Sequence, residues 1–142
     1  MEVPVSRPSM EEIWMQTAIN LSKRSKCSKA SVGCIITSKD FRKVLGNGYN
    51  GGAKGSNYIC KKDNCQCLHA ENNAVIDSGS AIKDKVFFIT MFPCLNCATQ
   101  IINSGCNKVY YHNKYREDSK HWCNYLTINV MFKKAKITIC QI

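Results

Sequence analysis

Two short motifs constrain the fold of this chain more than any other feature of its sequence, because their side chains are suited to share one metal ion. The first is His69-Ala70-Glu71 and the second is Pro93-Cys94-Leu95-Asn96-Cys97, with 25 residues from His69 to Cys94. Each motif stands where a helix is predicted to begin, just after a strand or a loop. His69, Cys94 and Cys97 are three zinc ligands, which leave the fourth position of a tetrahedral site open to water. The motifs therefore predict an open zinc site between two helix starts.

The glutamate of the first motif favours catalysis over a purely structural metal site. Zinc lowers the pKa of a bound water to roughly 7, which makes hydroxide available at neutral pH. Glu71 lies two residues after His69 and is not itself a ligand, so it is positioned to carry a proton from the water to a departing group. A structural site has no need of such a proton carrier. We therefore predict that Glu71 is the catalytic residue.

The apolar residues predict helices that alternate with extended segments, which favours an α/β layer fold. A capping box at Ser9-Met10-Glu11-Glu12 opens the first helix, which is predicted to fade near Ser25-Lys26-Cys27. The predicted apolar face of this helix comprises Ile13, Trp14, Thr17, Ala18 and Leu21. Strands are predicted at residues 32–36, 43–50, 86–90, 108–111 and 136–140, and further helices at 69–78, 94–104 and 119–132. The first two strands should form a hairpin, and the strands linked by helices should run largely parallel.

The length of 142 residues predicts a single domain, residues 1–142, that is large enough to bury a core. The start has no apolar h-region and no apolar run approaches the ~20 residues of a membrane span, so neither a signal peptide nor a membrane anchor is expected.

Ten cysteines then favour metal binding or catalysis in a reducing compartment, which predicts a cytoplasmic protein. The net charge of +10 suggests nucleic acid or a phosphorylated small molecule as a partner, or else a solvated basic surface.

A second group of cysteines indicates another metal site. Cys60, Cys65 and Cys67 lie in a loop predicted over residues 51–67, and Cys27 lies at the predicted end of the first helix. Four sulfur ligands form a closed tetrahedral site, so we interpret this group as a structural zinc site that ties the loop to the helix. The alternative is a set of unliganded loop cysteines, which would be prone to oxidation. The other cysteine-containing positions are interpreted as core or packing residues: Cys34, Cys106, Cys140 and the run His121-Trp122-Cys123.

The pair His-x-Glu and Pro-Cys-x-x-Cys is the signature of zinc-dependent nucleobase deaminases. Over nearly its whole length the chain resembles the deoxycytidylate (dCMP) deaminases of the cytidine deaminase superfamily. The residues that carry the resemblance are 32–33, 48–51 (Gly-Tyr-Asn-Gly), 69–75, 92–98, 101–102 and 114–119.

This resemblance implies a three-layer α/β/α sandwich with a five-stranded mixed sheet and a homo-oligomer, often a hexamer. It implies one catalytic zinc ion, and some members of the family carry a second. It also implies that Asn50 holds the sugar 3′-hydroxyl and that the backbone at Ala70 reads the pyrimidine edge. Cys27 and Cys60 match cysteines that contribute to the second zinc site. The family usually has a proline in the loop after Gly-Tyr-Asn-Gly, whereas this chain has Gly51-Gly52-Ala53-Lys54-Gly55. The resemblance therefore does not decide whether dCTP and dTTP regulate this protein.

The reaction implied by the resemblance is the hydrolytic deamination of dCMP to dUMP and ammonia. A nucleoside monophosphate carries about two negative charges near neutral pH, so cationic and hydrogen-bonding groups are expected at the mouth of the zinc pocket. Lys114 and Tyr115 are candidates because they follow the strand predicted at residues 108–111, whose carboxyl end should open near the zinc ligands.

Two alternatives remain. One is a deaminase of tRNA adenosine or of single-stranded DNA cytosine, which would share both motifs and suit the positive charge. The other is a non-enzymatic, zinc-stabilised binding module. The short chain and its free-nucleotide motifs favour the nucleotide enzyme, so neither nucleic acid nor a membrane is an expected partner.

Overall fold

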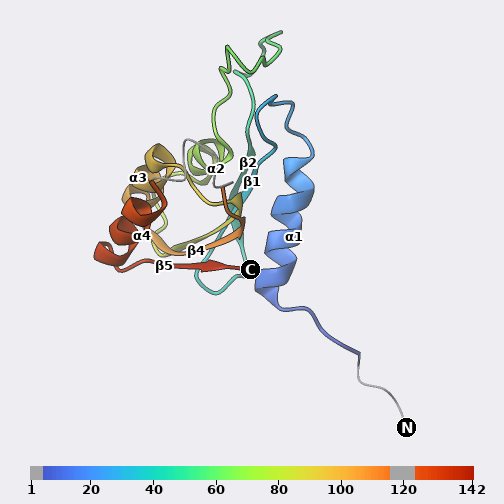
Figure 1. Ribbon diagram of the computed structural model, residues 1–142. Helices are drawn as coiled ribbons and strands as arrows, with labels where there is room; N and C mark the ends of the chain where they lie inside the picture. The colour runs from blue at the N-terminus through green and yellow to red at the C-terminus, as the bar shows by residue number, and fades with distance from the viewer. Residues whose placement is uncertain (1–4, 116–123) are drawn as a thin grey trace.

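The computed structural model describes residues 5–115 and 124–142, and this part of the chain forms three layers (Figure 1). A five-stranded sheet lies in the middle. Helix α1 (Met10–Ser22) covers one face, whereas α2 (Ala70–Ser78), α3 (Leu95–Asn103) and α4 (Tyr125–Lys134) cover the other. The strands are β1 (Gly33–Thr37), β2 (Val44–Tyr49), β3 (Lys85–Met91), β4 (Cys106–Asn113) and β5 (Thr138–Gln141). The predicted α/β/α sandwich with a mixed sheet is confirmed.

The strands follow the order β2-β1-β3-β4-β5. β1 is antiparallel to both of its neighbours, and β3, β4 and β5 are parallel to one another. The predicted hairpin and the predicted parallel half are therefore both confirmed. Because β1 alone runs in the opposite direction, the carboxyl ends of β2, β3 and β4 meet the amino end of β1 at one edge of the sheet. The register agrees with this, since Gly33 pairs with Tyr49 and Met91 pairs with Asn113.

The continuous apolar runs of β1 and β3 are explained by burial on both faces of the sheet. Side chains alternate along a strand, so Cys34 and Ile36 join the larger apolar cluster under α2, α3 and α4, whereas Ile35 joins the smaller cluster under α1. Cys34 is fully buried, and Cys106 and Cys140 are half-buried against these clusters, as expected of small core residues.

Two glycines of β2 let α2 pack directly on the sheet. A Cβ atom on Gly46 would lie 2.5 Å from the Ala74 carbonyl oxygen, and one on Gly48 would lie 2.6 Å from the Ala74 amide nitrogen. Both distances are far below ordinary van der Waals contact, so only glycine admits the helix at this separation. The close packing holds the start of α2, and with it His69, at the edge where the strands end.

Helix α1 begins as predicted but ends earlier and faces differently. The Ser9 hydroxyl accepts a hydrogen bond from the Glu12 amide at 3.1 Å, which is the expected N-cap. The α-helix ends at Ser22 and continues to Ser25 only as i to i−3 turns. The prediction that Ile13 faces the core is wrong: it is 41% exposed, because it lies about 140° around the helix from Ala18, at the centre of the buried face.

Two predictions lie outside the described residues: the start of the last helix at residue 119 and the run His121-Trp122-Cys123. Helix α4 is described from Tyr125 onward. Trp14 is half-buried at the margin of the smaller cluster, and its indole N–H donates to the Phe41 carbonyl at 2.9 Å. Across residues 5–115 and 124–142, every helix is too short or too polar to cross a membrane.

Candidate active site

The two predicted metal motifs meet at the edge of the sheet where the strands end. His69 is the N-cap residue of α2, and Cys94 is the N-cap residue of α3, which directly follows β3. Cys97 lies in the first turn of α3. The His69 Nδ1 atom lies 3.1 Å from the Cys97 Sγ atom and 3.4 Å from the Cys94 Sγ atom. The fold therefore brings together three side chains that the sequence separates.

These three ligand atoms fit a zinc ion. They all lie within 4.8 Å of one another. Tetrahedral zinc bonded to one nitrogen and two sulfurs places nitrogen and sulfur roughly 3.5 Å apart, close to the observed separations. Helix N-termini carry partial positive charge, which stabilises thiolates there. Hydrogen bonding to Cys97, and secondarily to His69, lowers the pKa of Cys94 to about 4, so this thiol is ionised at neutral pH.

Glu71 lies in the first turn of α2 beside this ligand set. It is only 4% exposed, yet it lines a cavity of about 550 Å³ together with His69 and Cys94. Burial raises the pKa of the Glu71 carboxyl above its ordinary value. A carboxyl group enclosed next to an open metal position can exchange protons with water or substrate bound there.

The cavity also gathers the four residues predicted to contact substrate, namely Asn50, Ala70, Lys114 and Tyr115. Asn50 is buried, and its amide group holds the neighbouring backbone: Nδ2 donates to the Ala30 carbonyl at 2.6 Å and Oδ1 accepts from the Val32 amide at 2.9 Å. One N–H and one lone pair of this amide remain for a ligand. Tyr115 packs edge to face against Phe92, with ring centroids 6.5 Å apart.

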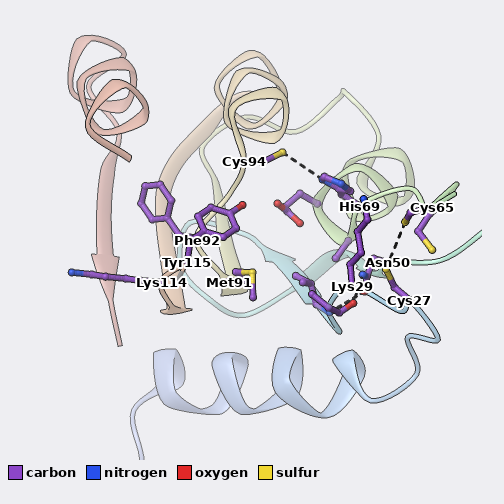
Figure 2. Close-up of a pocket in the computed structure, with 15 residues that line it drawn as sticks. Cys27, Lys29, Asn50, Cys65, His69, Met91, Phe92, Cys94, Lys114 and Tyr115 are labelled. Carbon is purple, nitrogen blue, oxygen red and sulfur yellow. Dashed lines mark hydrogen bonds between the residues drawn. The ribbon is translucent and has the colours of Figure 1, made fainter. Parts of the chain in front are cut away.

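The two lysines of the cavity point in different directions. The Lys114 ammonium lies over the Tyr125 ring, 5.4 Å from its centroid, and Figure 2 shows the side chain extending away from His69. Lys29 lies on the other wall, near Asn50, Cys27 and His69 (Figure 2). Sequence reasoning missed Lys29. The signal available was its place two residues after Cys27, a predicted metal ligand.

The second cysteine group also comes together. The four sulfur atoms of Cys27, Cys60, Cys65 and Cys67 all lie within 4.8 Å of one another. The Cys27 sulfur lies 3.8 Å from the Cys65 sulfur and 3.9 Å from the Cys60 sulfur. Tetrahedral zinc with four Zn–S bonds of ~2.3 Å requires sulfurs about 3.8 Å apart, so the cluster fits zinc. Hydrogen bonding from the Ser28 hydroxyl lowers the pKa of Cys60 to about 6.

Asn72 and Gln100 connect the two helices behind Cys97. The Asn72 amide lies 3.4 Å from the Cys97 sulfur and is hydrogen-bonded to the Gln100 amide. A metal-bound thiolate can only accept hydrogen bonds, so Asn72 must then turn its NH₂ group to the sulfur and its oxygen to the NH₂ of Gln100. Such partners of a ligand orient it toward the metal.

An α/β/α sandwich whose His-Cys-Cys ligand set stands beside a cavity lined by a glutamate defines the class of this protein, a zinc-binding deaminase domain. Residues 8–113 match the family described as the cytidine and deoxycytidylate deaminase zinc-binding region. The match covers most of the chain, and the chain belongs to this family.

Individual relatives and a solved structure agree. The chain is 33% identical over 130 residues to the deoxycytidylate deaminase of Schizosaccharomyces pombe, and the aligned region covers 80% of this chain and 40% of that protein. It is 32% identical over 127 residues to the deoxycytidylate deaminase of Mycobacterium phage D29, which covers 75% of this chain and 97% of that protein. The crystal structure of the dCMP deaminase from cyanophage S-TIM5 in complex with dCMP and dUMP superposes with a TM-score of 0.79 at 28% identity, over 97% of this chain and 100% of that one. The chain thus spans less than half of the yeast relative but nearly all of the phage proteins.

Proposed function

We propose that this protein catalyses the hydrolytic deamination of dCMP to dUMP and ammonia. The observation that carries the proposal is the single cavity that holds His69, Cys94 and Glu71 together with Asn50 and two lysines. A volume of about 550 Å³ is within the range of small-ligand sites. Family membership and the similarity to proteins named for dCMP deamination support this substrate.

In this proposal His69, Cys94 and Cys97 hold the catalytic zinc and leave its fourth tetrahedral position open. When bound, zinc supplies an activated water whose pKa is lowered to about 7, and so a nucleophile at neutral pH. The protein's contribution is to fix the three ligands on two rigid helices and to enclose the reacting atoms beside Glu71.

Glu71 carries the protons. The water oxygen bonds to C4 of cytosine and the bond between C4 and the amino nitrogen breaks. Glu71 moves one proton of the water to the ring nitrogen N3 and the other to the amino group, which leaves as ammonia. The carboxylate ends the cycle in the state in which it began, so no further reactant is needed.

The remaining residues orient the nucleotide. The backbone at Ala70, buried at the start of α2, reads the pyrimidine edge. Asn50 uses its free amide N–H or lone pair for the 3′-hydroxyl. The phosphate receives positive charge from Lys114 on one wall and Lys29 on the other, and a hydrogen bond from Tyr115. Lys114 reaches the phosphate by turning away from the Tyr125 ring.

The test is a comparison of kcat/KM on dCMP, deoxycytidine and a cytosine-containing oligonucleotide. Contacts that orient the base through the phosphate should make kcat/KM on deoxycytidine lower by orders of magnitude. Lys114→Ala should weaken dCMP use and leave the deoxycytidine rate nearly unchanged, whereas Lys134→Ala, an exposed lysine at the end of α4, should change neither. Equal use of dCMP and deoxycytidine, or faster turnover of the oligonucleotide, would refute the assignment. The polymer-acting alternative is not favoured, because the relatives described above are deoxycytidylate deaminases.

Three further properties belong to the proposal. The cluster of Cys27, Cys60, Cys65 and Cys67 holds a second, structural zinc ion, supported by its sulfur separations. The protein works in a reducing compartment such as the cytoplasm, because thiolate ligands must stay reduced. It forms a homo-oligomer, such as a hexamer, supported by apolar side chains exposed on the helices: Ile76 on α2 at 70%, and Leu126 and Val130 on α4 at 77% and 51%.

A further inference from the structure

The four-cysteine cluster and the catalytic ligand set line the same cavity. Cys27, Cys65 and Cys67 lie on its wall together with His69 and Cys94, so the second metal site is part of the substrate pocket. Figure 2 shows Cys27 and Cys65 close to Asn50 and Lys29, on the side of the cavity where His69 lies. The position of the second metal site therefore allows it to influence substrate binding as well as to tie the 51–67 loop to the end of α1.

The 27–32 segment, which leads from α1 to β1, forms this wall and is anchored at both ends. At one end Cys27 belongs to the cluster, and Ser28 donates to the Cys60 sulfur from its backbone N–H at 3.4 Å, with its hydroxyl 3.2 Å from the same atom. At the other end the Asn50 side chain bonds the backbone of Ala30 and of Val32. Lys29 stands between the two anchors.

The cluster is also joined to the catalytic helix. Cys67 comes two residues before His69, and Leu68 between them exchanges two backbone hydrogen bonds with Gly51, at 2.8 and 3.1 Å. Gly51 directly follows Asn50. These contacts form a closed ring. Asn50 is bonded to the 27–32 segment, and that segment is joined to the sulfur cluster through Cys27. The cluster leads through Cys67 to Leu68, which pairs with Gly51, the neighbour of Asn50. A metal ion in the cluster completes this ring beside the cavity.

We propose that the four-cysteine metal site determines the preference for a 5′-phosphate, by holding the 27–32 segment so that Lys29 faces the cavity. The proposal rests on the proposed function, since it concerns how dCMP is told from deoxycytidine. Without metal, Asn50 still holds one end of the 27–32 segment, but the end at Cys27 is no longer fixed. The Lys29 side chain then loses conformational freedom each time a phosphate binds. His69, Cys94 and Glu71 stay in place on α2 and α3. Cys27, Cys60, Cys65 and Cys67 are thus positioning residues for Lys29.

The experiment measures zinc content and equilibrium binding rather than turnover. Zinc per chain is determined in wild type, Cys60→Ser and Cys140→Ser, and the dissociation constants of dUMP and deoxyuridine are measured by calorimetry. Cys60 does not appear among the residues of the cavity wall, and Cys140 is a half-buried thiol in β5 that serves as the control. We expect Cys60→Ser to lose one zinc and to bind dUMP several-fold to about tenfold more weakly, the cost of ordering one lysine side chain. Deoxyuridine binding should change less than about twofold, and Cys140→Ser should match wild type.

Lys29→Ala provides the second arm and leaves all four sulfurs intact. It should weaken dUMP binding to a similar extent with full zinc content, and it should add little further loss in the Cys60→Ser background. The proposal is overturned if Lys29→Ala leaves dUMP binding unchanged, whether or not Cys60→Ser folds. It is also overturned if Cys60→Ser weakens both ligands equally, or loses zinc and keeps the wild-type preference. If wild type itself fails to prefer dUMP over deoxyuridine, the proposed function fails instead.

Discussion

Replacing Gly48 by alanine should displace the active site by shifting α2, without changing any of the predicted metal ligands. The new Cβ atom would meet the Ala70 carbonyl oxygen most closely and would lie 2.6 Å from the Ala74 amide nitrogen, whereas ordinary contacts begin near 3.4 Å, so the helix must move by at least about 0.8 Å. The atoms that it meets belong to helix backbone and cannot turn aside. Overpacking of this kind costs up to ~3 kcal/mol. With an unfolding entropy of roughly 0.3 kcal/mol/K for 142 residues, the thermal midpoint should fall by about 10 °C.

Gly46→Ala is the matched control, because it acts on the same helix at the other end. Its Cβ atom would lie 2.5 Å from the Ala74 carbonyl oxygen and 2.8 Å from the Ser78 amide. Both variants should lose similar stability in thermal unfolding. Gly48 faces the helix start beside Glu71, so Gly48→Ala should lower kcat/KM on dCMP about 100-fold, as a 1 Å misplacement can. Gly46→Ala should stay within a few-fold of wild type. The reasoning is refuted if Gly48→Ala keeps wild-type activity, or if both variants lose activity equally at equal stability.

Three further predictions concern the metal sites. Glu71→Gln should keep the catalytic zinc in metal analysis and lose a factor of roughly 10² to 10⁴ in kcat, whereas a wild-type rate would end the proton-carrier assignment. Metal analysis of wild type should find two zinc ions per chain, and Cys67→Ser should lower this to about one and reduce the thermal midpoint, because structural zinc binding contributes to folding; one zinc in wild type would remove the second site. Asn72→Leu should weaken zinc binding at the catalytic site by about 10- to 100-fold in a chelator competition, and unchanged affinity would show that Asn72 does not orient Cys97.

Much of this fold follows from local sequence patterns. The helix starts at His69 and Cys94 and the buried strands β1 and β3 were predicted within one or two residues, because short signals such as Pro93 before a helix, and continuous apolar runs, depend on neighbours in the chain. The orientation of α1 was not predicted correctly at Ile13. Trp14 and Ala18 face the sheet as predicted, but Met15 joins them in place of Ile13, because which stripe of a helix is buried depends on how the sheet lies beneath it.

The sequence by itself determined which residues can bind metal, because zinc accepts few side-chain types and the motif spacing is restrictive. Tertiary structure alone decided which cations reach the cavity. The chain has 20 lysines and arginines, and local patterns singled out Lys114, which follows a predicted strand, but not Lys29. The first lies with Cys27, Asn50 and His69 on one wall, and the second reaches out over Tyr125. That difference arises because β1 runs against its neighbours and brings the end of the 27–32 segment to the edge where β2, β3 and β4 end, an arrangement set by strand order rather than by any stretch of sequence.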